Sequence, residues 1–241
     1  MNIGIDQGNT SAKVAIYERS KLHASFIFKP LTLGRLTNLI NEFSPSQGIL
    51  SSVADVNPEV ISFLKEKLNR FVVLDEQTPM PITIQYKTPQ TLGRDRIASA
   101  VGAYTKHPDR NLLVIDSGTA ITYDLIQAGG IYSGGNISPG MTIRFKALNN
   151  YTKRLPMLDE NGDIPELGYD TESAIRAGVV NGIVKEINAY IDEFEIKYPD
   201  LLVFLTGGHS FYFETKLKKS IFADGNLVLD GLNEILNYQY V

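Results

Sequence analysis

The sequence predicts an α/β protein built from two duplicated lobes, each with a mixed sheet flanked by helices. Three strand-like segments open the chain and alternating helical and strand patterns follow, which is typical of an α/β sheet with an antiparallel edge. A strand–turn–strand segment at residues 3–17 also recurs at residues 112–126, where Ile115-Asp116-x-Gly118 repeats Ile5-Asp6-x-Gly8 after 116 − 6 = 110 positions. We therefore expect a first lobe over residues 1–110 and a second lobe over residues 111–241.

The first lobe is expected to begin with two antiparallel strands folded over a Gly-rich turn, followed by a third strand at residues 21–28. Apolar residues at helical spacing then predict helices over residues 31–43 and 58–68, each followed by a buried strand, at residues 48–53 and 71–74. Residues 77–90 contain three prolines and form a rigid connector with one strand at residues 82–86. A helix follows, with residues 93–96 at its N-terminal end.

In the second lobe, the repeated strand–turn–strand segment leads to a further strand at residues 131–137 and, after Pro139, to a helix over residues 141–148. Residues 151–169 are polar and form a loop. A long helix runs from residue 170 or 171 through residue 196, and a buried strand at residues 201–205 enters the turn Thr206-Gly207-Gly208. Residues 227–229 and a terminal helix from Asp230 complete the lobe.

The composition excludes several classes of protein. The 241 residues are 43% hydrophobic and 21% charged, which is enough for a globular core. There is no cysteine, so disulfides, thiolate zinc sites and cysteine nucleophiles are excluded. The net charge is −4 and the basic residues are scattered, so we expect no nucleic-acid partner. Asp6 interrupts the first apolar run too early for a signal peptide, and no run is long enough to span a membrane. We expect a cytoplasmic protein without a membrane partner.

The first turn contains the groups that a phosphate site needs. Asp6 supplies a carboxylate, Gly8 exposes a backbone N–H, Thr10 supplies a hydroxyl and Lys13 a cation. A nucleoside triphosphate with Mg²⁺ needs an acidic group for the hydration shell of the metal, N–H and hydroxyl donors for phosphate oxygens, and positive charge. An ordinary hairpin with a polar tip is the alternative interpretation, and the second copy of the turn favours the phosphate site.

Other nucleotide-binding motifs are absent from the sequence. No Gly-Lys dipeptide occurs, which excludes a Walker loop, and no G-x-G-x-x-G occurs, which removes the dinucleotide and protein-kinase signatures. The segment Arg94-Asp95-Arg96 places the carboxylate of Asp95 between two guanidinium groups. The Asp95 carboxylate could act as a base in phosphoryl transfer, and a neighbouring guanidinium group could bind a carboxylate of the substrate. A surface ion pair at the start of a helix is the other interpretation.

Two Asp-x-Gly turns and a late Gly-Gly turn resemble the actin, sugar-kinase and heat-shock-chaperone ATPase superfamily, in which two actin-like (ribonuclease H-like) lobes clamp ATP. Within that superfamily the chain is similar to the type III pantothenate kinases over nearly its whole length. Six motifs stand in the order of that family: Asp6-Gln-Gly8-Asn9-Thr10 with Lys13, Gly93-Arg94-Asp95-Arg96, Asp116 to Thr122, Gly134 to Gly140, Thr171 to Gly178, and Thr206-Gly207-Gly208.

The resemblance implies that a homodimer phosphorylates the primary hydroxyl of pantothenate with ATP, giving 4'-phosphopantothenate, the first step of coenzyme A biosynthesis. The pantothenate pocket would lie close to the subunit interface. Mg²⁺ would accompany ATP and contact Asp6 through water, Asp116 would hold K⁺ or NH₄⁺, and Asp95 would be the base. The residues that would contact ATP are Asp6, Gln7, Gly8, Asn9, Thr10, Ser11, Ala12, Lys13 and Thr119. Those that would contact pantothenate are Tyr86, Gly93, Arg94, Asp95, Arg96 and Thr171.

Structural roles are the alternatives at several of these positions. Tyr86 can be a packing residue, Asp116 can brace its turn and Thr171 can be a helix N-cap. Two other functions also stay open, namely a kinase or phosphatase of the superfamily with another substrate, and a non-catalytic regulator with the same fold. A regulator should have lost catalytic groups, and the presence of Asp6, Lys13, Asp95 and Asp116 favours an enzyme.

Overall fold

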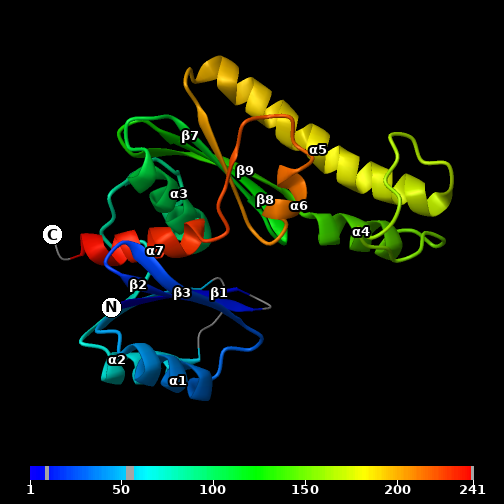
Figure 1. The fold of residues 1–241 in the computed structure, drawn as a ribbon. Coiled ribbons are helices and arrows are strands. Elements are labelled where there is room, and N and C mark those ends of the chain that lie inside the picture. Colours follow the sequence, from blue (N-terminus) through cyan, green and yellow to red (C-terminus); the bar gives the residue numbers. More distant parts are fainter. Residues whose placement is uncertain (9–10, 53–56, 240–241) are drawn as a thin grey trace. The chain divides into compact units, whose positions relative to one another are not determined.

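The structure is a computed structural model that describes residues 1–8, 11–52 and 57–239 (Figure 1). Contacts divide the chain into two compact units. The first unit contains residues 1–109, 126–133 and 226–241, and the second contains residues 110–125 and 134–225. The division into lobes after residue 110 stays a proposal. The contact-based units differ from it because the last helix and the tip of one hairpin belong to the first unit.

The first unit contains a five-stranded sheet with the order β3-β2-β1-β4-β5. Its strands are β1 (Asn2–Gln7), β2 (Ala12–Glu18), β3 (Lys21–Phe28), β4 (Gln47–Ser52) and β5 (Arg70–Val73). The β1–β2 and β2–β3 pairs are antiparallel, and the β1–β4 and β4–β5 pairs are parallel. The expected mixed sheet with an antiparallel edge is therefore confirmed.

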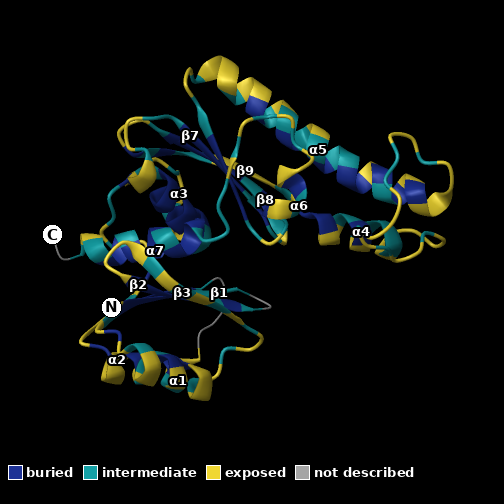
Figure 2. Cartoon of the chain, in the orientation of Figure 1, coloured by how far each residue is buried: buried dark blue, intermediate teal, exposed yellow. Residues whose placement is uncertain are grey.

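Helices cover both faces of this sheet. Ile3 and Ile5 point to one face, where they pack with α1 (Leu33–Phe43) and α2 (Pro58–Lys67). Residues between them in a strand point to the opposite face. There Gly4 approaches Leu229 and Leu232 of α7 (Leu227–Tyr238), which contacts β1, β2 and β4. The central strands are buried on both sides, as the dark colour of β1 and β2 in Figure 2 shows.

Two glycines let α3 (Arg94–Lys106) cross α7 at close range. A Cβ atom on Gly102 would clash with the carbonyl oxygen of Leu227, and one on Gly231 would clash with the carbonyl oxygen of Ala98. The small-residue face of α3 therefore serves helix packing. This packing holds α3, whose first turn contains Asp95, against the rest of the first unit.

The second sheet has six strands in the order β11-β10-β7-β8-β9-β6. They are β6 (Thr83–Ile84), β7 (Leu112–Ser117), β8 (Ala120–Gln127), β9 (Ile131–Pro139), β10 (Leu202–Thr206) and β11 (Phe222–Ala223). The second unit contains α4 (Met141–Asn150), α5 (Thr171–Lys197) and α6 (Ser210–Glu214), whereas β6 and residues 126–133 of β8 and β9 belong to the first unit. A stripe along α5 at helical spacing, Val179, Ile183, Ile187 and Ile191, packs into the core of this unit.

The elements agree with the expected ones except near the connector and the C-terminus. The strand expected over residues 82–86 is only Thr83–Ile84, because the paired stretch of β9 is only two residues long. A short helix (η1, Pro89–Thr91) follows it. The last helix begins at Leu227 instead of Asp230, and the apolar residues Leu227, Val228 and Leu229 form its buried first turn. The two-residue strand β11 is too short to give a sequence pattern.

None of the helices in the part of the chain that the structure describes is long and apolar enough to cross a membrane.

Candidate functional site

The first Asp-x-Gly turn joins β1 to β2 in the first unit. Asp6, near the end of β1, lies opposite Lys13 of β2 in the antiparallel register. The backbone N–H of Gly8 donates to the carbonyl oxygen of Ser11 over 2.9 Å, and the Gln7 side chain donates to the carbonyl oxygen of Gly8, also over 2.9 Å. Ala12 is buried as the first residue of β2. The predicted ligands Asn9 and Thr10 lie outside the described residues.

The carboxyl group of Asp6 lies in an unusual electrostatic environment. Burial, and to a smaller extent the nearby Asp95 carboxylate, raises the pKa of Asp6 from its ordinary value of 3.8 to about 6, while Lys13 acts in the opposite direction. Asp6 and Asp95 therefore influence one another although they are 95 − 6 = 89 positions apart. The structure places the turn and the proposed base within one unit.

A neutral residue in place of Asp6 is expected to stabilise the ligand-free protein at pH 7. The pKa of Asp6 is higher in the folded protein than in the unfolded chain. Below pH 3.8 Asp6 is protonated in both states and costs no stability. As the pH rises through about 6, the folded protein must ionise a buried carboxyl group, so its free energy of unfolding falls. We expect Asp6→Asn to raise the free energy of unfolding at pH 7 by roughly 2–3 kcal/mol, because each unit of pKa shift corresponds to about 1.36 kcal/mol. Urea unfolding at pH 4 and pH 7 measures this difference.

The matched control is Asp75→Asn. Asp75 is exposed, and its pKa is lowered mainly by a hydrogen bond from Thr78, so removing its charge should not stabilise the protein at pH 7. Equal stabilities of the Asp6→Asn variant and the wild type at both pH values would mean that the Asp6 carboxylate carries no burial cost.

Asp95 lies in the first turn of α3, whose N-cap is Gly93. The Asp95 side chain turns back over the start of the helix, where its Oδ1 accepts a hydrogen bond of 2.9 Å from the backbone N–H of Arg96. A Cβ atom on Gly93 would lie 2.5 Å from this oxygen, so glycine makes room for the carboxylate. The partial positive charge at a helix N-terminus favours an anion at this place.

The two arginines beside Asp95 have different environments. Arg94 forms an ion pair with Glu76 over 2.7 Å and donates to the carbonyl oxygens of Pro89 and Leu92. It therefore fastens the Pro-rich connector to α3. Arg96 is only 6% exposed, and its guanidinium carbon lies 6.0 Å from the centre of the Tyr86 ring. The structure brings Arg96 and Tyr86 together, whereas Arg94 contacts Glu76 and the connector.

The second Asp-x-Gly turn joins β7 to β8 in the second unit. The backbone N–H of Gly118 donates to the carbonyl oxygen of Ala120 over 3.0 Å, and that of Gly140 donates to the carbonyl oxygen of Thr119 over 3.0 Å. A Cβ atom on Gly140 would clash with the carbonyl oxygens of Gly118 and Thr119. The predicted motif ending at Gly140 therefore packs directly on this turn, and the side chain of Thr119 is exposed.

Asp116 and the late Gly-Gly turn meet in the same unit. Thr206 of β10 pairs with Asp116 of β7, and Gly207 follows with a φ of +95°, in the region that favours glycine. A Cβ atom on Gly207 would clash with the carboxylate of Asp116 and lie 2.6 Å from the carbonyl carbon of Ser117. Gly118 on the other side would bring a Cβ to 3.1 Å from the same carboxylate oxygen. The two glycines thus make the space that this carboxylate occupies.

Thr171 is the first residue of α5, and Asp170 is its N-cap. The Asp170 carboxylate accepts a hydrogen bond of 2.7 Å from the backbone N–H of Ser173, and the Ser173 hydroxyl completes a capping box. The exposed side chain of Thr171 is therefore not needed for capping. It lines a mostly apolar groove of about 710 Å³ between α4 and α5, together with Ala174, Gly178 and other residues of the two helices.

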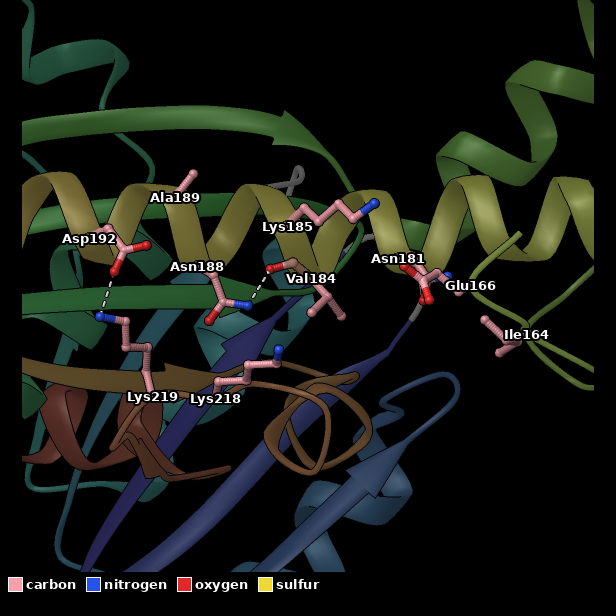
Figure 3. Close-up of a pocket in the computed structure, with 10 residues that line it drawn as sticks. All are labelled: Ile164, Glu166, Asn181, Val184, Lys185, Asn188, Ala189, Asp192, Lys218 and Lys219. Atoms are coloured by element: carbon pink, nitrogen blue, oxygen red, sulfur yellow. Dashed lines mark hydrogen bonds and ion pairs between the residues drawn. The ribbon is translucent and has the colours of Figure 1, made fainter. Parts of the chain in front are cut away.

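A second cavity of the same unit, of about 640 Å³, contains none of the predicted site residues (Figure 3). It lies along α5 and is lined by Lys185, Asn188 and Asp192 of that helix and by Lys218 and Lys219. Asp192 forms an ion pair with Lys219 across it. Lys185 and Lys218 are exposed, and the buried oxygen of the Asn188 side chain has no hydrogen-bond partner among the residues that the structure describes.

A partly buried polar network was not predicted from the sequence. The Tyr123 hydroxyl donates to Glu186 of α5 over 2.8 Å, and Arg144 of α4 forms an ion pair with the other oxygen of Glu186. Arg144 also donates to the carbonyl oxygen of Pro139 and to the Ser138 hydroxyl. The network fixes the corner between β9 and α4. No local sequence pattern predicts this network, because Tyr123 and Glu186 are 186 − 123 = 63 positions apart.

The sequence matches the family model described as type III pantothenate kinase over residues 2–193. Curated relatives with this description extend over almost the whole chain. A protein of Bacteroides fragilis is 48% identical over 238 residues, which are 99% of this chain and 98% of the relative. One from Azobacteroides pseudotrichonymphae is 47% identical over 99% of this chain and 97% of the relative, and one from Porphyromonas gingivalis is 42% identical over 98% of both.

Solved structures share the fold at lower sequence identity. A structure from Campylobacter jejuni described as a Baf family transcriptional activator has a TM-score of 0.62 with 23% identity, and covers 98% of each chain. The ROK hexokinase from Thermus thermophilus has a TM-score of 0.51 with 11% identity, and covers 100% of this chain and 99% of the hexokinase. These likenesses extend to the fold alone.

Proposed function

Because this chain belongs to the type III pantothenate kinase family, we propose that Asp95 is the general base that activates the primary hydroxyl of pantothenate for attack on ATP. The protein is a pantothenate kinase with an actin-like fold, and it phosphorylates pantothenate in coenzyme A biosynthesis. The observation that carries the assignment of the base is the place of Asp95 in the first turn of α3, where its carboxylate accepts a hydrogen bond from the start of the helix. The Asp95 carboxylate also lies close enough to Asp6 to contribute to the raised pKa of that group.

The proposed step is an in-line phosphoryl transfer. Asp95 takes the hydroxyl proton, the hydroxyl oxygen forms a bond to the γ-phosphorus of ATP, and the bond from that phosphorus to the leaving oxygen of ADP breaks. Gln7, Gly8, Ser11 and Ala12 of the turn and the cation of Lys13 are assigned to the phosphates. The backbone N–H of Gly8, which was expected to be open, already donates to the carbonyl oxygen of Ser11. Asn9, Thr10 and Thr119 are assigned to ATP by the order of the motifs. Such a reaction depends mainly on positioning and on charge neutralisation.

Pantothenate carries a carboxylate, and we assign Arg96 as its partner. A buried guanidinium group held at the face of Tyr86 offers a planar pair of donors to a carboxylate. Tyr86 and Gly93 form the wall beside it. Arg94 acts through its ion pair with Glu76, which holds the connector in place. Thr171, whose hydroxyl is exposed in the α4–α5 groove, is assigned to pantothenate as well.

Two cations are assigned to the reaction. Mg²⁺ supplies charge neutralisation on the phosphates when it is bound. It keeps several water ligands in most kinase sites, so the Asp6 carboxylate fits a contact through water. K⁺ or NH₄⁺ is assigned to Asp116, whose carboxylate oxygen occupies the space left by Gly118 and Gly207. Carboxylate and carbonyl oxygens can coordinate K⁺ and can accept hydrogen bonds from NH₄⁺.

The test is phosphorylation of pantothenate by the purified protein with ATP, Mg²⁺ and K⁺, followed by mass spectrometry of the product. We expect 4'-phosphopantothenate from the wild type, and since ATP is the donor we place the enzyme in the cytoplasm. No product from a folded protein that binds ATP would overturn the assignment of the substrate.

We also propose that two copies associate through the α4–α5 face of the second unit. Large apolar side chains are exposed around it, among them Tyr151 at 89%, Leu167 at 86% and Tyr169 at 71%. An exposed apolar patch beside an apolar groove is typical of an interaction surface. In a dimer with two-fold symmetry, this patch on one copy would pack against the same patch on the other copy.

Leu167→Asp is expected to shift the protein from dimer to monomer, because a carboxylate would have to be buried in the interface. Sedimentation velocity between about 1 and 50 μM measures the state. The matched control is Ile196→Asp, at the far end of α5, where an equally exposed side chain (83%) is replaced. A Leu167→Asp protein that sediments as the wild-type dimer would place the interface elsewhere.

A further inference from the structure

The edge of the second sheet holds the connector that carries Tyr86. Thr83 and Ile84 of β6 pair in parallel with Ile131 and Tyr132 of β9. The backbone N–H of Thr83 donates to the carbonyl oxygen of Gly130 over 2.8 Å, and that of Gln85 donates to the carbonyl oxygen of Tyr132 over 2.9 Å. This pairing ends one residue before Tyr86, so it sets the position from which the Tyr86 side chain extends.

Tyr132 also contacts Tyr86 through its ring. The two ring centres are 6.4 Å apart and the rings are inclined at 66°, an edge-to-face arrangement. Tyr132 is fully buried, whereas Tyr86 is half-buried and has Arg96 near its ring. A fully buried ring therefore supports a ring that faces the proposed carboxylate partner.

The turn that precedes β9 packs against α3. Gly130 has a φ of +83°, and a Cβ atom placed on it would lie 2.9 Å from the ring of Tyr104 and 3.3 Å from the carbonyl oxygen of Pro81. Tyr104 belongs to α3, the helix that presents Asp95 and Arg96 at its other end. The turn thus touches both the connector and the helix, and residues 126–133 accordingly belong to the first unit.

From these contacts we propose that Tyr132 is a positioning residue for pantothenate, acting through Tyr86, and that residues 129–132, the end of the turn and the start of β9, set the distance between Tyr86 and Arg96. The proposal rests on the assignment of Tyr86 and Arg96 to pantothenate. Loss of the Tyr132 ring should let Tyr86 leave its place. The binding of pantothenate should then weaken, and the binding of ATP should not.

The test compares the steady-state kinetics of Tyr132→Leu and Tyr132→Phe with those of the wild type. For Tyr132→Leu we expect the KM for pantothenate to rise about 3- to 10-fold, the size of one lost aromatic pair, with the KM for ATP and kcat within about 2-fold. Tyr132→Phe keeps the ring and should restore the wild-type KM. Gly130→Ala, which presses on Tyr104 and Pro81, should raise the same KM.

Tyr17→Leu is the matched control for lost stability. Tyr17 is equally buried in the first unit, and its hydroxyl contacts Asp230 of α7. It should lower the melting temperature without changing the KM for pantothenate. An unchanged KM in Tyr132→Leu, or an equal rise for ATP, would overturn the role of Tyr132. Failure of the wild type to phosphorylate pantothenate would instead overturn the assignment of substrate on which the inference rests.

Discussion

Asp95→Asn is expected to lower kcat by about 100- to 10,000-fold, the contribution of a positioned general base. Asparagine keeps the shape of aspartate, and its side-chain oxygen can still accept the hydrogen bond of 2.9 Å that the backbone N–H of Arg96 donates to Asp95. It cannot accept the proton of the pantothenate hydroxyl. The start of α3 and the phosphate turn should therefore stay intact, and the loss should fall on turnover.

The measurement is kcat with saturating ATP and pantothenate, together with the dissociation constant of ATP from calorimetry. We expect ATP to bind to Asp95→Asn at least as tightly as to the wild type, since a negative charge near Asp6 is removed. Asp109→Asn is the matched control, because it removes an exposed carboxylate beyond the other end of α3. Turnover of Asp95→Asn within a few-fold of the wild type would remove Asp95 from the role of base.

The strands and turns of the site were predictable because they depend on local patterns. Strand–turn–strand segments around Asp6 and Asp116 show alternating or continuous apolar runs broken by glycine, and both appear in the structure at these places. The order of the motifs also predicted the family correctly. Residues close in sequence share a turn whatever the rest of the chain does, so such features can be recognised without a structure.

The partners of individual side chains were not predictable in the same way. The resemblance to the family singles out Arg96 as the partner of the substrate carboxylate, but it does not show that Arg96 lies at the Tyr86 ring while Glu76 and two carbonyl oxygens hold Arg94. Spacing fixes the face of a helix on which a residue lies, but its partner depends on a distant segment. The support of Tyr86 by Tyr132 has the same origin, since strand β6 is too short to show that it pairs with β9.

Replacement of K⁺ by Na⁺ is expected to lower the activity of the wild type, and Asp116→Asn is expected to abolish this dependence on the ion. The carboxylate of Asp116 is assigned to the ATP-binding side of the second unit, where it would repel the triphosphate. Two unit charges about 5 Å apart repel by about 3 kcal/mol at an effective dielectric constant of about 20, which corresponds to roughly 100-fold in rate or affinity. A bound cation removes this penalty.

The ion and the carboxylate should therefore depend on one another. Without a K⁺-like ion the wild type should lose roughly 100-fold in kcat/KM for ATP, whereas Asp116→Asn, which has no charge to neutralise, should keep an intermediate activity in K⁺, Na⁺ or choline salts at equal ionic strength. Asp124→Asn tests whether any buried aspartate of this unit would give the same result, because Asp124 is fully buried in β8. If Asp116→Asn required K⁺ as strongly as the wild type does, the ion would have to bind to other residues, and Asp116 would be left with the role of bracing its turn against Gly118 and Gly207.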